Sequence, residues 1–156
     1  SPPRAMTQRM PAAFAAAAEL AVAEMRRESE RLIALRDRFE QGVRTRIPEV
    51  IVSAAGADRL PGHSHLVFPG AQGDSLLLLL DMEGIAVSTG SACQAGVPEP
   101  SHVVRAMGRS EVEARSALRI TLGRTSSAED IDLLLEALPT AYERARRAGL
   151  SSRDVR

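Results

Sequence analysis

Hydrophobic residues recur at helical spacing over the first third of the chain. Between residues 11 and 46 they fall on one stripe, while arginine and acidic residues cover the other faces, which predicts one long amphipathic helix. The stripe consists of Met25, Leu32, Leu35, Phe39 and Val43. Pro11 suits the first turn of this helix, and Pro48 ends it.

Short segments with β-branched or alternating residues predict four strands further along the chain. These segments are Glu49–Ser53, His65–Phe68, Ile85–Val87 and Ala117–Leu122. In the last of them Leu118 and Ile120 are expected to point to one side of the sheet and Arg119 to the other.

Polar caps and glycines mark further helices between the strands. A helix over Ser75–Glu83 is expected to be capped by Asp74 and closed by Gly84. Ser101 begins a second, shorter helix that ends at Met107.

The last helix is expected to begin with a capping box formed by Ser126 and Glu129. We expect it to bend at Pro139 and to end at Gly149. The order α-β-β-α-β-α-β-α predicts an α+β domain with a small, mostly antiparallel sheet and helices on one face. We expect residues 1–10 to form a flexible arm, residues 11–149 to form the domain and residues 150–156 to form a tail.

Composition narrows the classes of function. The 156 residues carry 20 basic and 20 acidic side chains, and only 3% of residues are aromatic, so no nucleic-acid binding is expected. No apolar run is long enough to predict a membrane span. A single cysteine cannot form an internal disulfide, which favours a reducing, cytoplasmic setting. Every basic residue is arginine, and without lysine this chain cannot complete Schiff-base chemistry alone.

The single cysteine, Cys93, lies within Ser88–Gly96, a run of small residues. Gly90 and Gly96 give the backbone freedom and the neighbours offer little to pack against, which indicates a reactive thiol on a mobile loop. The alternative is a buried structural thiol, since free cysteine is among the most buried residue types.

Arginine and histidine supply the other candidate groups. Arg119 is either a solvated surface residue or a planar fork that clamps a carboxylate. His63 and His65 share one strand face, as two ligands of a metal would, but no third ligand is evident and no metal site is expected. His102 is expected to pack or cap at the start of a helix.

Several segments together resemble the cysteine desulfurases of the NifS/IscS type, within the class V aminotransferases. These segments are residues 84–93, 99–108, 118–124 and 127–132, and the Ser-x-Gly-Ser-Ala-Cys block that ends at Cys93 is the most specific of them. The resemblance implies the small domain of the aspartate-aminotransferase-like architecture of pyridoxal-phosphate enzymes, which are usually homodimers.

The resemblance also implies roles for two residues. Cys93 matches the nucleophile that takes the sulfur of L-cysteine as a persulfide and leaves L-alanine. Arg119 matches the arginine that holds the substrate carboxylate. The persulfide would pass to an acceptor protein, such as an iron-sulfur scaffold or a tRNA-thiolation protein.

The cofactor-binding residues of that family lie in a large domain that has no counterpart in this sequence. We therefore expect a C-terminal small domain, truncated from its parent, with no pyridoxal phosphate bound to this chain and no activity of the chain alone. Two alternatives remain: a stand-alone persulfide carrier fed by another desulfurase, and an inert remnant of the fold.

Overall fold

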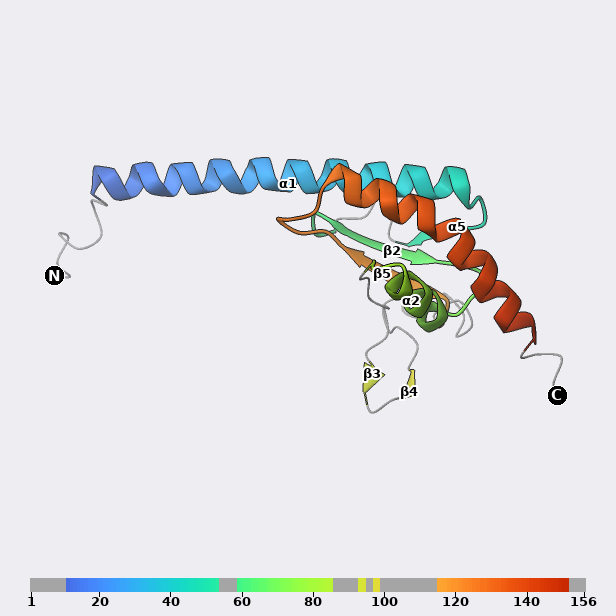
Figure 1. Cartoon of the computed structure of the whole chain (residues 1–156). Coiled ribbons are helices and arrows are strands. Elements are labelled where there is room, and N and C mark those ends of the chain that lie inside the picture. The colour runs from blue at the N-terminus through green and yellow to red at the C-terminus, as the bar shows by residue number, and fades with distance from the viewer. Residues whose placement is uncertain (1–10, 54–58, 86–92, 95–96, 99–114, 152–156) are drawn as a thin grey trace.

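The computed structural model describes residues 11–53, 59–85, 93–94, 97–98 and 115–151 (Figure 1). Its elements in chain order are α1 (Ala12–Arg46), β1 (Ile51–Ser53), β2 (His63–Val67), α2 (Gly73–Met82), β3 (Cys93–Gln94), β4 (Val97–Pro98), β5 (Ala117–Thr121) and α5 (Ala128–Ser151). The helix expected after Ser101 lies outside the described residues.

The main sheet has three strands in the order β1-β2-β5, and both pairings are antiparallel. Leu66 in the central strand pairs with Val52 on one side and with Leu118 on the other. Because successive strand residues point to opposite faces, this register gives the sheet two distinct faces. One carries the leucines of the core; the second face carries Ile51, Ser53, His63, His65, Val67, Ala117, Arg119 and Thr121.

All three long helices pack on the leucine face. Figure 1 shows α1 and α5 side by side along the sheet, and side chains of α2 join the same buried cluster. The largest side chains of this cluster are Phe39, Phe68, Leu66, Leu76, Leu80, Leu118, Ile131 and Leu138. The predicted α+β class, with a small antiparallel sheet and helices on one face, is confirmed in these described elements.

The first half of α1 extends beyond the sheet (Figure 1). No residue between 12 and 27 is buried, and the helix contributes its first buried side chain at Phe39. Met25, which the periodicity placed in the core stripe, is 69% exposed, so that part of the prediction is wrong. The stripe itself is continuous, but the sheet and α5 lie only beneath its second half.

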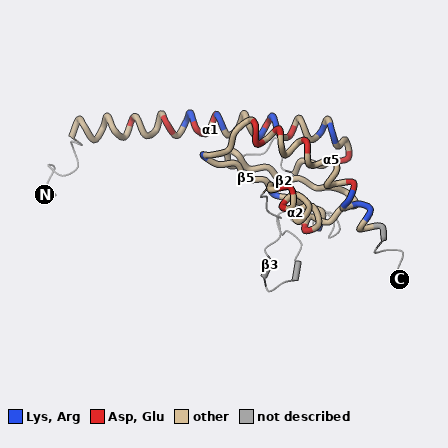
Figure 2. Tube along the Cα trace, in the orientation of Figure 1, with Lys and Arg blue, Asp and Glu red and all other residues tan. Residues whose placement is uncertain are grey.

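Helix α1 has no separate acidic and basic segments. Figure 2 shows acidic and basic positions interspersed on α1. None of the helices in the described part of the chain is long and apolar enough to cross a membrane.

The predicted helix caps differ from the observed ones by small shifts. Gln72, not Asp74, occupies the N-cap of α2. At the start of α5 the reciprocal hydrogen bonds join Ser127 and Asp130, one residue later than the predicted capping box. Gly84 follows α2 with a φ of 79°, as its predicted role requires.

Two further boundaries were also predicted imperfectly. Pro139 lies inside helix α5, as predicted, but the helix continues past the predicted end at Gly149 to Ser151. Ile85, the first residue of the predicted third strand, lies in no strand, and the rest of that segment is outside the described residues.

Candidate functional site

The strongest candidate side chain, Arg119, lies in the middle of β5. Its neighbours Leu118 and Ile120 are buried in the core, at 0% and 3% exposure, whereas Arg119 is exposed on the second face of the sheet. The predicted alternation is therefore confirmed, and its cause is the period-two geometry of the strand. A guanidinium held this way is directed away from the core and toward whatever approaches that face.

Arg119 belongs to a row that crosses all three strands. His65 in β2 pairs with Arg119 on one side and with Ser53 in β1 on the other. Directly opposed residues of antiparallel strands have Cβ atoms about 4.5–5.5 Å apart. Cross-strand pairing thus brings a guanidinium, an imidazole and a hydroxyl to one line on the second face.

Two members of this row have polar atoms that are buried and unsatisfied. Ser53 is only 2% exposed, and its Oγ has no hydrogen-bond partner among the described residues. Both ring nitrogens of His65 are likewise buried without such a partner. These three atoms are covered and not open to a ligand, and the same face also carries a small apolar cluster of Val67, Ala117 and Ile51.

The charge of Arg119 affects the protonation of its neighbour in the row. Burial, and then the positive charge of Arg119, lower the pKa of His65 below its usual range. His65 is therefore neutral at pH 7 and presents one N–H donor and one nitrogen acceptor. Beside it, the guanidinium supplies several donors in a planar fork that matches a carboxylate.

The other histidines add little to this site. His63 lies on the same face of β2 but pairs with Thr121, one step along from the row. In the part of the chain that the structure describes, no group of three or more histidine, cysteine or acidic side chains could hold a metal ion. His102 lies outside the described residues.

The backbone of Cys93 forms β3, which pairs antiparallel with β4 through Cys93–Pro98 and Gln94–Val97. The sequence predicted a loop here, so this short ladder is a local difference. The pair lies apart from the main sheet in Figure 1. The surroundings of the Cys93 side chain, and residues 86–92 before it, lie outside the described residues. The structure thus groups Arg119 with His65 and Ser53, and does not show the thiol against them.

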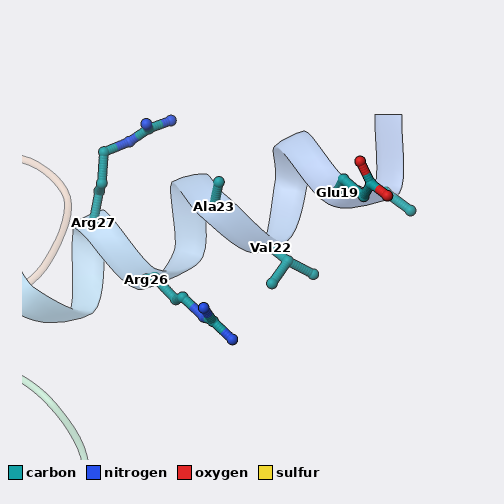
Figure 3. Close-up of a pocket in the computed structure, with 6 residues that line it drawn as sticks. Glu19, Val22, Ala23, Arg26 and Arg27 are labelled. Carbon is teal, nitrogen blue, oxygen red and sulfur yellow. The ribbon is translucent and has the colours of Figure 1, made fainter. Parts of the chain in front are cut away.

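Two of the surface hollows among the described residues lie away from Arg119. One of about 520 Å³ lies on the projecting half of α1. In Figure 3 its two arginines, Arg26 and Arg27, point to different sides of the helix and converge on no common point. Another hollow, of about 470 Å³, lies between the end of β5 and the start of α5, where Ile85 and Leu133 line it. Neither hollow contains Arg119.

Comparison with known proteins identifies the family. The Aminotransferase class-V family model matches residues 2–134, so the chain belongs to that family. Relatives of this chain are named as cysteine desulfurases. An IscS-like cysteine desulfurase of Mycobacterium tuberculosis is 50% identical over 142 residues, which are 89% of this chain and 36% of that protein. A cysteine desulfurase of Cereibacter sphaeroides is 45% identical over 72% of this chain and 29% of its own length.

Solved structures agree with this assignment. A NifS-like protein from Rickettsia africae superposes with a TM-score of 0.65 at 27% identity, over 75% of this chain and 29% of that chain. This chain spans about a third of the length of the curated relatives that it matches, 36% in the first case.

Class V aminotransferases depend on pyridoxal phosphate, but the residues of this chain do not fit that group. The sequence contains no lysine that could join to its aldehyde. Among the described residues, the side chain predicted to contact a substrate is Arg119, exposed on the second face of the sheet.

Sequence reasoning found Arg119 from its alternation but missed Ser53. A partial signal was present, since His65 begins one predicted strand and Arg119 lies on the polar side of another. Which strands pair, and in which register, is set by the tertiary fold, so the row could not be deduced from spacing.

Proposed function

We propose that this chain is the C-terminal part of a pyridoxal-phosphate-dependent cysteine desulfurase, which converts L-cysteine to L-alanine and holds the sulfur on Cys93. The observation that carries the proposal is the 50% identity to the Mycobacterium tuberculosis relative over nearly the whole chain. The exposed Arg119, held between two buried residues of β5, supplies the carboxylate site that such a reaction needs.

In this proposal Arg119 binds the carboxylate of L-cysteine through its planar fork and so orients the substrate. The Cys93 thiolate attacks the sulfur of the substrate. A sulfur–sulfur bond forms and the carbon–sulfur bond of the substrate breaks. The electron pair of the broken bond goes to the substrate carbon, which takes a proton and becomes the methyl group of alanine. The thiol of this chain is left as a persulfide.

The cofactor would be held by a separate, lysine-bearing domain, where it provides an electron sink for the substrate carbon. By the same proposal the complete enzyme is a homodimer in the cytoplasm, where the thiol stays reduced. It passes the persulfide sulfur to an acceptor protein. The chain alone, supplied with L-cysteine and pyridoxal phosphate, is expected to release no alanine.

A chimera tests the proposal. The matching third of the Mycobacterium tuberculosis relative is replaced by this chain, and alanine and sulfide are measured with L-cysteine and a thiol reductant. We expect activity that is abolished by Cys93→Ala and a raised KM for L-cysteine in Arg119→Gln. Arg124→Gln, which removes another exposed arginine close in sequence, is the matched control and should behave as the parent.

Full activity of the Cys93→Ala chimera would overturn the proposed role of the thiol. The alternative of a stand-alone persulfide carrier is not favoured, because the relatives are named as desulfurases over the matching region.

A further inference from the structure

The turn that joins β5 to α5 is bound by a side chain of α1. The guanidinium of Arg31 donates hydrogen bonds to the backbone carbonyl oxygens of Gly123 and Arg124, each at 3.1 Å. A third bond, at 2.6 Å, goes to the carbonyl oxygen of Ser126. Within the turn, the amide of Gly123 donates to the Ser126 hydroxyl and the amide of Ser126 to the Gly123 carbonyl. Three carbonyls of one short turn thus converge on a single arginine.

A carboxylate on the same helix orients this guanidinium. Glu28, one turn earlier on α1, accepts two hydrogen bonds from Arg31, at 2.8 and 2.9 Å. The bond from Arg31 lowers the pKa of Glu28 below its usual range, so the carboxylate is charged at neutral pH. Both side chains are about a third exposed, so the ion pair by itself contributes little to stability. Together the two side chains and residues 123–126 form a clamp between α1 and the end of β5.

The clamp lies where α1 passes from its projecting half to its packed half. Among the described residues, the bonds of Arg31 are the first hydrogen bonds in chain order that join α1 to another element. The next residue, Leu32, lies against the segment before β2, since a Cβ placed on Gly62 would be 3.4 Å from the Cβ of Leu32. The amide of Leu122 donates to the Gly62 carbonyl at 2.8 Å. One turn of α1 is therefore fixed to the end of the strand that carries Arg119.

We propose that Arg31 is a positioning residue: by binding the turn after β5, it fixes the direction in which the projecting half of α1 leaves the sheet relative to Arg119. This inference rests on the proposed function, in which Arg119 holds the substrate carboxylate and the cofactor-bearing domain precedes α1. That domain is then connected to Arg119 through α1. Both must contact one small substrate, and misplacement of either weakens binding or slows the reaction.

The first test uses the full chain and needs no enzyme activity. Cys93 is replaced by alanine, and spin labels are attached to Ala17→Cys and Thr121→Cys, two exposed positions on the projecting half of α1 and at the end of β5. Pulsed electron paramagnetic resonance measures the distribution of distances between the labels. We expect a narrow distribution with Arg31 present and one about twice as broad in Arg31→Met.

Arg38→Met is the matched control. Arg38 also joins α1 to α5, through the side chain of Asp132, but both partners are about half exposed. Its removal should leave the distribution narrow, and circular dichroism verifies that each variant is folded. Equal widths in Arg31→Met and Arg38→Met would overturn the inference.

Two milder substitutions separate binding of the turn from the charge. Arg31→Lys keeps a positive charge beside Glu28 but lacks the planar fork that reaches the carboxylate and the carbonyls together, so the distribution should stay broad. Glu28→Gln keeps the guanidinium but removes the charge that orients it, and should broaden the distribution less than Arg31→Met. A distribution in Arg31→Lys as narrow as that of the parent would contradict the proposed contact with the turn.

The second test is a double-mutant cycle in the chimeric desulfurase. Arg31→Met is expected to raise the KM for L-cysteine about fivefold in the parent chimera and less than about twofold in an Arg119→Gln background, because nothing is left there to position. A loss of folded enzyme alone would lower kcat in both backgrounds and leave KM unchanged. Equal rises of KM in the two backgrounds would refute an action through Arg119.

The two hypotheses fail differently in these experiments. An inactive parent chimera counts against the proposed function, and the distance distributions then decide the role of Arg31 alone. An active chimera whose KM is the same in Arg31→Met as in Arg38→Met counts against the role of Arg31 and leaves the desulfurase proposal intact.

Discussion

The carboxylate of Glu40 on α1 accepts two hydrogen bonds from the guanidinium of Arg59, one to each oxygen. The Ser64 hydroxyl of β2 donates a third, at 2.8 Å. Only 5% of the Glu40 side chain and 16% of the Arg59 side chain are exposed. The pair therefore joins the long helix, the segment before β2 and the sheet through one buried charge that is well satisfied.

Removing the charge of Glu40 should destabilise the fold strongly. Glu40→Gln leaves the Arg59 guanidinium without its counter-charge in a mostly buried place, at an expected cost of about 3 kcal/mol in the free energy of unfolding. Urea denaturation followed by circular dichroism measures it. The control is Asp132→Asn, which breaks the pair with Arg38 where both side chains are about half exposed. That change should cost less than about 1 kcal/mol.

The same carboxylate predicts how stability depends on pH. Burial raises the pKa of Glu40, but the hydrogen bonds from Arg59 and Ser64 and the nearby positive charges of Arg59 and Arg36 outweigh it, so the net pKa is lowered. The folded state therefore binds this proton less readily than the unfolded chain. The stabilisation is complete above the ordinary glutamate pKa of about 4.5 and is lost as pH falls toward the lower, folded value.

Unfolding free energies measured from pH 7 down to pH 3 check this expectation. The acid-side slope should be steeper in the parent chain than in Glu40→Gln, which has no carboxyl group to protonate at this position. Identical slopes would show that Glu40 does not contribute to acid sensitivity.

Gly73 is required by a close approach between α2 and β5. A Cβ placed on Gly73 would lie 2.2 Å from the backbone oxygen of Ala117, which cannot move aside as a side chain would. Gly73→Ala should therefore cost about 2–3 kcal/mol through overpacking. Gly123→Ala is the control, since a Cβ there meets nothing within 4 Å. Thermal unfolding of both variants distinguishes them, and equal stabilities would contradict the packing argument.

Two phenylalanines on the same helix should differ sharply. Phe39 is fully buried between α1, the sheet and α5, and Phe39→Ala is expected to cost about 3–5 kcal/mol. Phe14 is 59% exposed on the projecting half of α1, and Phe14→Ala should change stability by less than about 0.5 kcal/mol. Chemical denaturation is the measurement. A large loss in Phe14→Ala would mean that the projecting half is covered in solution.

Much of the fold follows from local pattern. The helix over 12–46, the strand around Arg119 and the end of α2 at Gly84 were predicted from periodicity and glycine placement, and all are present. The burial of the helical stripe was predicted less well. Periodicity shows which face of a helix is apolar, but it does not show whether another element covers that face. Met25 has the right spacing but is 69% exposed.

The site was only half predictable for a similar reason. Alternation placed Arg119 on the polar face, but Ser53 and His65 become its neighbours through strand pairing across long stretches of chain. The cap of α5 shifted by one residue because Ser126 and Ser127 are chemically alike, and local geometry decided for the second. The role of Cys93 stays a prediction.

The length of α1 has a mechanical consequence. Its residues 12–27 project as a rod of roughly 24 Å, at about 1.5 Å per residue, and none of them is buried. A tilt of about 5° where the rod leaves the sheet would displace its tip by roughly 2 Å. Catalytic groups on two bodies need alignment finer than that. A group at its far end would therefore need contacts of its own to stay aligned with the arginine of β5.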